Sequence, residues 1–349
     1  MRTFRSDNNA ALCPEALRAI IDANEGGHVT GYGDDEWTAR AVRAFRSLFG
    51  AETSVFLVAT GTAANTLAVA SLTEPWEQVV CHHHSHYNDD ESTAPERLTH
   101  CRCHPIRTDA TKLTPADIEL AASGQRGDVH QPQPGVVTVS NTTELGTVYT
   151  PAEMRALCEA AHAHGFRVHV DGARFANAVA ALDCDPRALT VDAGVDALSF
   201  GGTKNGLAFG EAVLFFPQGD GAAHARATYA FPFHRKGTGH LLSKHRFVAA
   251  PFAATLADDV WRRHASHANA MAARLASGLE SRGLVPRVPV EANAVFVALP
   301  ASVDAALRAG GHGYYPFGDA AWGVSRLMCS FDTSVADVDG LLADVSSAG

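Results

Sequence analysis

Short apolar stretches alternate with longer segments of helix-forming residues along most of this 349-residue chain. The apolar stretches are rich in Val, Leu and Phe, which is typical of strands buried on both faces of a mainly parallel sheet. Such strands are expected at 54–59 (SVFLVA), 78–81 (QVVC), 135–140 (GVVTVS), 167–171 (RVHVD), 196–200 (DALSF) and 212–216 (AVLFF).

Two of the intervening segments carry clear helix signals. Residues 62–72 (TAANTLAVASL) are rich in Ala and Leu, and residues 151–164 follow Thr150, which can cap a helix that begins with Pro151. Residues 124–134 (GQRGDVHQPQP) are polar and Pro-rich, so we expect a surface loop there. The pattern therefore predicts an α/β fold made of repeated β-α-β units.

The character of the chain changes near residue 250. A long helix-compatible run over residues 255–282 leads to two further apolar stretches, ANAVFVALP and VSRLMCSFDT. We interpret these stretches as strands of a smaller α+β domain, since a chain of this length usually exceeds one compact domain. The expected division is an N-terminal arm with a large domain over residues 1–250 and a small C-terminal domain over residues 251–349.

Composition and charge favour small-molecule chemistry in the cytoplasm. The chain is 46% hydrophobic with a formal net charge of -10 and no Lys/Arg block, which argues against a nucleic-acid partner. No apolar run approaches the roughly twenty residues of a membrane span, and the N-terminus lacks the plan of a signal peptide. The seven scattered cysteines are expected to be reduced thiols.

Two polar residues follow apolar strands at the edge where open α/β sheets bind ligands. Lys204 lies in the Gly-rich segment DALSFGGTKNG, and Asp171 ends the strand of RVHVDGARF. Each alone has an ordinary interpretation, because most lysines are solvated and an Asp after a strand often caps a helix. Together they supply the imine-forming lysine and the acid for the ring nitrogen that pyridoxal 5′-phosphate (PLP) chemistry requires. We therefore predict that Lys204 carries PLP as a Schiff base.

A third motif suits the phosphate of such a cofactor. Gly61 and Thr62 open a predicted helix, whose N-terminal N–H groups and dipole favour an anion. The segment lacks a P-loop lysine and the spacing GxGxxG, so a phosphate monoester is favoured over a nucleotide.

Four histidines lie in the segment CHHHSHYNDDES, at positions 82, 83, 84 and 86. A metal site is the alternative, but alternate residues of an extended segment are expected to point apart and no Cys/His pair follows at zinc spacing. We expect no metal, and an imidazole that stacks on the cofactor ring and transfers protons near neutral pH. His86 is the best candidate.

Several motifs in order resemble the low-specificity L-threonine aldolase family, PLP enzymes of fold type I that belong with the β-eliminating lyases. The motifs are YGDD (32–35), TGTAAN (60–65), HVDGARF (169–175), SFGGTKNG (199–206) and SRLMC (325–329). The resemblance covers nearly the whole chain. It implies a mainly parallel, seven-stranded type of sheet with a smaller C-terminal domain. It also implies a homodimer or a dimer of dimers, hence a homotetramer, with the active site at the subunit interface.

The resemblance assigns roles position by position. It implies that Lys204 binds PLP, that Asp171 partners the pyridine nitrogen, that Gly61 and Thr62 bind the phosphate, and that His86 stacks on the ring. The substrate carboxylate would be held by Ser6, Arg174 and Arg326, while Tyr32 would reach the neighbouring subunit's site.

The sequence departs from the family at two places. Glu144, in SNTTELGT, stands where better-known members have a histidine, so a carboxyl group would meet the substrate hydroxyl. Where the family often has a phosphate-binding arginine, this chain offers Lys236 or Lys244, and either can equally be a surface charge.

The implied reaction is the reversible cleavage of L-threonine, L-allo-threonine and related β-hydroxy-α-amino acids to glycine and an aldehyde. The same scaffold serves other PLP activities, so a β-eliminating lyase, an aminotransferase, a racemase or a transaldolase is the alternative. A PLP-fold protein that binds its ligand without catalysis is the alternative from another class.

Overall fold

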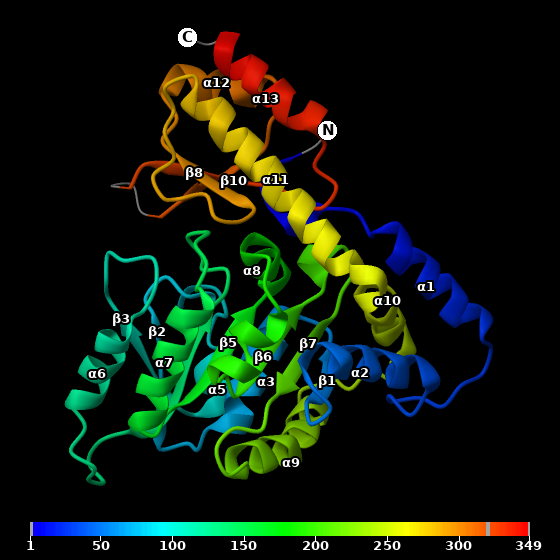
Figure 1. Cartoon of the computed structure of the whole chain (residues 1–349), viewed down its shortest axis with the longest axis vertical. Coiled ribbons are helices and arrows are strands. Elements are labelled where there is room, and N and C mark those ends of the chain that lie inside the picture. The colour runs from blue at the N-terminus through cyan, green and yellow to red at the C-terminus, as the bar shows by residue number, and fades with distance from the viewer. Residues whose placement is uncertain (1–2, 319–321, 348–349) are drawn as a thin grey trace.

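The computed structural model describes residues 3–318 and 322–347, which form a large unit around a seven-stranded sheet and a small unit around a three-stranded sheet (Figure 1). The long helix α11 (Val260–Glu280) runs between the two units (Figure 1). The start of the chain packs on the small unit, because the N–H group of Phe4 donates to the Gly313 carbonyl and its carbonyl accepts from Met328.

The large sheet has the strand order β1-β7-β6-β5-β4-β2-β3. Strand β7 is antiparallel to both of its neighbours and every other pair is parallel, so six strands point the same way. The α/β prediction with a mainly parallel sheet is confirmed. The strands are β1 (Ser54–Val58), β2 (Glu77–His82), β3 (Arg102–Ile106), β4 (Gln133–Ser140), β5 (Arg167–Gly172), β6 (Ala197–Gly201) and β7 (Glu211–Phe215).

Helices cover both faces of this sheet. The two helices predicted most clearly are present as α3 and α7, and Thr150 caps α7 in a reciprocal capping box with Glu153. The helices of the large unit are α1 (Pro14–Glu25), α2 (Glu36–Phe49), α3 (Gly61–Leu72), α4 (His86–Asp89), α5 (Ala94–Thr99), α6 (Pro115–Ser123), α7 (Pro151–Ala163), α8 (Phe175–Leu182), α9 (Ala222–Gly237) and α10 (Arg246–Leu256).

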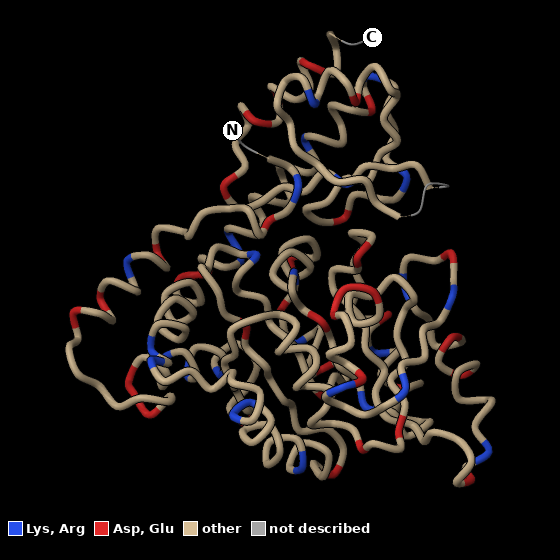
Figure 2. The backbone as a smooth tube through the Cα atoms, turned by 180° about the vertical axis from the view of Figure 1, so that it is seen from behind, with Lys and Arg blue, Asp and Glu red and all other residues tan. Residues whose placement is uncertain are grey.

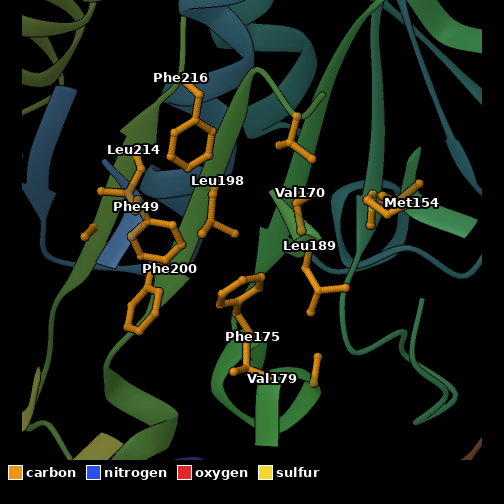
Figure 3. Packing of buried hydrophobic residues seen from close by; sticks show 14 of the residues in the cluster. Phe49, Met154, Val170, Phe175, Val179, Leu189, Leu198, Phe200, Leu214 and Phe216 are labelled. Carbon is orange, nitrogen blue, oxygen red and sulfur yellow. The ribbon is translucent and has the colours of Figure 1, made fainter. Parts of the chain in front are cut away.

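Alternate residues of β4, β6 and β7 enter different hydrophobic clusters. In β7, Leu214 packs with Phe49 on one face, whereas Val213 and Phe215 pack on the other face with Phe231 of α9. Figure 3 shows part of the first cluster, where aromatic side chains lie against the sheet. Burial on both faces explains why these strands are continuous apolar runs in the sequence.

The small unit contains the two strands predicted near the C-terminus. Its antiparallel sheet has the order β8 (Ala294–Val297), β10 (Val324–Met328), β9 (Tyr315–Phe317), and it packs with α11, α12 (Ala301–Ala309) and α13 (Val335–Ser347). The helical run predicted over 255–282 is not continuous, because the backbone at Asp258 and Asp259 is left-handed (φ 49° and 53°). The domain division at residue 250 falls within α10 and stays a prediction.

The surface carries both signs of charge. Lys and Arg residues are interspersed with Asp and Glu along the chain (Figure 2). Across residues 3–318 and 322–347, no helix has both the length and the apolar character needed to cross a membrane.

The backbone of Gly201, just before the loop that carries Lys204, lies very close to the backbone of Ala173. This close packing allows a prediction about stability. A Cβ atom on Gly201 would lie 2.3 Å from the Ala173 carbonyl oxygen, a backbone atom that cannot rotate away. We expect Gly201→Ala to lower the free energy of unfolding by about 1–3 kcal/mol, measured by urea denaturation. Gly340→Ala is the control, because its Cβ in α13 meets no atom within 4 Å and alanine favours a helix. Equal stability of the two variants would contradict this expectation.

Candidate active site

Two adjoining cavities open at the edge of the sheet where the parallel strands end. Their volumes are about 330 Å³ and 320 Å³. Both are lined by Asn8, His86, Asp171, Ala173 and Lys204. The structure therefore brings together the lysine, the acid and the imidazole that the sequence singled out.

Lys204 lies in a short 3-10 turn (Thr203–Asn205) directly after β6. The turn is held on both sides, since the Asn205 amide donates to the Trp261 carbonyl (2.8 Å) and the Gly202 N–H donates to Glu211 Oε2 (2.7 Å). Burial lowers the pKa of Lys204, and the charge of Arg174 lowers it further. The amine is therefore more readily neutral than a surface lysine, as attack on a carbonyl carbon requires.

Asp171 ends its strand as a buried carboxylate with both oxygens engaged. Oδ1 accepts from the Ala173 N–H (2.9 Å), and Oδ2 accepts from the Asn65 amide (2.8 Å). Burial alone would raise the pKa of Asp171. The charges of His86 and Lys204 and the hydrogen bond from the Ala173 N–H outweigh this effect, so the pKa of Asp171 lies below its usual range. An ionised carboxylate is therefore available to a basic ring nitrogen in the cavity.

His86 is part of a hydrogen-bonded chain that the sequence did not predict. Its Nδ1 lies 2.8 Å from Glu91 Oε1, and the Asn65 amide donates both to Glu91 (3.0 Å) and to Asp171. The hydrogen bond to buried Glu91 raises the pKa of His86. Glu91 lies in the acidic run NDDES, where no sequence signal separates the buried acid from its exposed neighbours.

The other three histidines lie apart from this chain of hydrogen bonds. The rings of His83 and His84 are stacked with centroids 4.0 Å apart, and His82 Nε2 lies 2.9 Å from the Ala110 carbonyl oxygen. The expectation that these neighbouring side chains point apart is wrong, because β2 ends at His82 and the chain then turns.

Two groups of possible metal ligands occur among the described residues, each with ligand atoms within 4.8 Å of one another. One group is His86, Glu91 and Asp171, whose atoms are already hydrogen-bonded to one another or to Asn65. The other is Cys13, Glu15 and His264, outside both cavities. The prediction that the active site needs no metal stays a prediction.

The second cavity reaches the N-terminus of α3. Thr60, Gly61 and Thr62 line it, and the Thr60 hydroxyl caps the helix by accepting from the Ala63 N–H. A Cβ on Gly61 would meet no atom within 4 Å, so the space beside these N–H groups is open. The first N–H groups of a helix have no partner within it, and they suit the oxygens of a phosphate.

The candidate lysines and Tyr32 lie outside this cavity. The Lys236 ammonium is 5.1 Å from the centroid of the Tyr32 ring, and Lys244 lines a separate hollow beside Gly31. Tyr32 is 55% exposed and has a left-handed backbone (φ 62°).

Ser6 and two arginines line the other end of the site. Arg174 is clamped by Asp7, with Nε to Oδ2 at 2.7 Å and Nη2 to Oδ1 at 2.9 Å. Among the described residues, Arg326 makes a long contact to the Arg5 carbonyl (3.4 Å) and lies over the Phe317 ring (5.7 Å to the centroid), while its buried Nε has no hydrogen-bond partner there. Asp7 was not predicted, although it directly follows Ser6. Asp7 offsets the charge of Arg174. The positive charge of Arg326 is therefore less compensated than that of Arg174.

Glu144 follows β4 and lines the first cavity. Its Oε1 accepts from the Ser140 hydroxyl (2.5 Å) and from the His86 N–H (2.7 Å). Burial raises the pKa of Glu144. A carboxyl group therefore lies beside the His86 backbone, where the sequence departs from the better-known pattern.

The groups that can bind a ligand are arranged in order along the two cavities. N–H groups lie at one end, Lys204 and Asp171 lie in the middle, and two guanidinium groups lie at the other end. The set fits a molecule with a phosphate, a carbonyl carbon and a basic ring nitrogen, which is the chemistry of PLP, beside a carboxylate.

Comparison with known proteins agrees with this description. The beta-eliminating lyase family model matches residues 3–302. The low specificity L-threonine aldolase of Pseudomonas aeruginosa is 44% identical over 344 residues, 98% of this chain and 96% of the relative. The one from Saccharomyces cerevisiae is 24% identical over 307 residues, 86% of this chain and 74% of the relative.

Solved structures support the same relationship. The threonine aldolase of Leishmania major has a TM-score of 0.90 at 27% identity, covering 100% of this chain and 98% of that one. A serine palmitoyltransferase from Sphingomonas wittichii, at 16% identity, shares the fold with a TM-score of 0.71 over 99% of this chain and 86% of that one. The chain therefore belongs to the beta-eliminating lyase family and, within it, groups with the low-specificity L-threonine aldolases that its motifs predicted.

Proposed function

We propose that this chain is a PLP-dependent aldolase that reversibly cleaves L-threonine, L-allo-threonine and related β-hydroxy-α-amino acids to glycine and an aldehyde. The observation that carries the proposal is that Lys204, Asp171 and His86 line the same cavities, between a helix N-terminus and two guanidinium groups. The names of the relatives that match nearly the whole chain support this reaction.

The cofactor would be held at three points. Gly61 and Thr62 donate N–H groups to the phosphate, Asp171 holds a proton on the ring nitrogen, and Lys204 provides the covalent link. When bound, PLP supplies the electron sink for cleavage at the substrate's α-carbon. The role of Asp171 depends on its being ionised, and the lowered pKa supports this.

The α-carboxylate of the substrate would lie among Ser6, Arg174 and Arg326. A charge-assisted contact from a guanidinium group is both strong and directional, so it can orient the Cα–Cβ bond for cleavage. Asp7 fixes the position of Arg174 through two hydrogen bonds. Arg326 supplies most of the attraction, since its charge is less compensated.

The β-hydroxyl proton would move to His86. Its Nδ1–H donates to Glu91, which leaves the lone pair on Nε2 free to accept the proton. Glu144, whose Oε1 accepts from the His86 backbone N–H, would hydrogen-bond to the same substrate hydroxyl. The hydrogen bond to Glu91 raises the pKa of His86, which makes the neutral imidazole a stronger base.

The proposal includes a homodimer or a dimer of dimers in the cytoplasm. Neither Lys236 nor Lys244 lines the cavity of its own chain, and Tyr32 is exposed. A neighbouring subunit can bring these groups to the phosphate. All seven cysteines are described as free thiols, which agrees with a reducing compartment.

Lys204→Ala tests the covalent link. The variant should lose the visible absorption of lysine-bound PLP and nearly all cleavage of threonine, because among the described residues that line the cavities no other carries an amine. Spectroscopy and glycine release measure the two effects. Lys112→Ala is the control, since that ammonium pairs with Glu153. Turnover with an intact band in the Lys204 variant would refute the assignment.

Arg326→Ala tests the carboxylate site. We expect glycine affinity and kcat/KM for threonine to fall about ten- to a hundredfold, the loss of roughly 1.5–3 kcal/mol from a charge-assisted contact, with PLP affinity nearly unchanged. Arg308→Ala is the matched control, because its ion pair with Asp304 is exposed. Unchanged glycine affinity with a lowered melting temperature would make Arg326 a structural residue instead.

Glu91→Gln tests the base. His86 must be neutral to accept a proton, so activity rises as pH increases through its pKa. Glu91 raises that pKa, and removing the carboxylate should move the acidic limb of the kcat/KM profile to lower pH. The plateau should fall by less than the ~100-fold typical of losing a general base. Glu96→Gln, at an exposed acid, should leave the limb in place. A Glu91→Gln profile that coincides with the wild type would exclude this role.

A further inference from the structure

A buried carboxyl group lies at the phosphate end of the site, where a negative charge would repel the ligand. Glu211 begins β7 and pairs with Val58 of β1 and Gly201 of β6. Val58 precedes the turn that opens α3, and Gly201 precedes the loop of Lys204. Glu211 is 7% exposed and lines the same cavity as Gly61 and Thr62.

The described partners of Glu211 are two groups that lead into Lys204. The Gly202 N–H donates to its Oε2 at 2.7 Å, and the side chain of Thr203, the next residue, acts on the same carboxyl group and lowers its pKa. Thr203 lines the cavity as well. A hydroxyl has one proton, so Thr203 can donate either to Glu211 or to a ligand, but not to both.

The protonation state of Glu211 decides which of these two happens. Burial raises the pKa of Glu211 to about 7, so the acid binds a proton near neutral pH. A protonated carboxyl donates to the Thr203 oxygen, and the Thr203 proton then turns toward the cavity. An ionised carboxylate keeps that proton and adds a negative charge beside the phosphate.

We propose that Glu211 is a phosphate-subsite residue that acts as a neutral acid, and that it donates to Thr203 so that the Thr203 hydroxyl donates to the cofactor phosphate. The inference rests on the proposed PLP function and extends it. Binding of the phosphate then takes up one proton at Glu211 when the pH exceeds the pKa of this group in the free protein.

Other ionisable groups face the same region, and their effects on the pH dependence of binding must be distinguished from that of Glu211. Lys204, Asp171 and His86 line the cavity, Arg235 donates to the Leu57 carbonyl of β1, and His240 contacts the Ala59 N–H. These groups are identical in wild type and in Glu211→Gln. Glutamine keeps the acceptor for Gly202 and donates to Thr203 at every pH, so it imitates the protonated acid.

The test measures affinity for 4′-deoxypyridoxine 5′-phosphate by calorimetry from pH 6 to pH 9. This ligand has the ring and the phosphate but no aldehyde, so it forms no bond with Lys204. Above pH ~7 the dissociation constant of the wild type should rise, relative to that of Glu211→Gln, by up to about tenfold per pH unit, the slope for uptake of one proton. Pyridoxine, which lacks the phosphate, is the control ligand and should show the same pH profile in both proteins.

Three results would overturn the inference while leaving the PLP proposal in place. Parallel profiles of the phosphate ligand in both proteins would show that Glu211 does not titrate with phosphate binding. A Glu211-dependent slope with pyridoxine would assign the effect to the ring. In Thr203→Val, a slope that still depends on Glu211 would exclude the relay through the hydroxyl. If neither protein binds the phosphate ligand at any pH, the PLP proposal itself fails and the inference fails with it, an outcome distinct from parallel profiles.

Discussion

Apolar packing on both faces of most of the seven-stranded sheet favours the placement of unpaired charged residues at the ends of its strands. Side chains on both faces of β4, β6 and β7 enter hydrophobic clusters, so an unpaired charge within these strands would be costly to bury. Because six strands point the same way, their carboxyl ends meet at one edge. Asp171, Lys204 and the N-terminus of α3 therefore converge there, although they are far apart in the sequence.

The convergence brings charges into a confined space, and paired hydrogen bonds keep them there. Asn65 donates to two carboxylates, Asp171 and Glu91, and Glu91 in turn holds His86. At the other end of the site, Asp7 holds Arg174 with two hydrogen bonds and accepts a third from Asn293 of the small unit. Unpaired, each of these groups would pay a large desolvation penalty. Together they hold the site in a fixed geometry before any ligand binds.

The sequence predicts what local patterns encode. Lys204 and Asp171 are visible because each ends a strongly apolar run beside glycine, and the central strands are visible for the same reason. The sequence does not predict strands β3 and β9. Strand β3 is a half-exposed edge strand, and β9 has only three residues. Glu91, Asn65 and Asp7 are not predicted for another reason. Each has a partner far away in the sequence, with a separation of 26 residues between Asn65 and Glu91, of 106 between Asn65 and Asp171, and of 167 between Asp7 and Arg174, so only the folded chain shows that these polar residues are buried and paired.

The two ends of the site differ in the groups that they offer to a negatively charged part of a ligand. At the carboxylate end, the Asp7–Arg174 pair is nearly neutral and gives direction, while Arg326 adds attraction from a strand of the small unit. At the phosphate end, this chain contributes N–H groups, hydroxyls and Glu211, whose raised pKa keeps it neutral for longer than an ordinary acid. Arg235 brings a guanidinium group to this region by donating to the Leu57 carbonyl of β1, whereas Tyr32 and Lys236 lie exposed, away from the cavity of their own chain. The carboxylate end therefore attracts its anion by charge, while the phosphate end would depend on the protonation state of Glu211 to avoid repulsion.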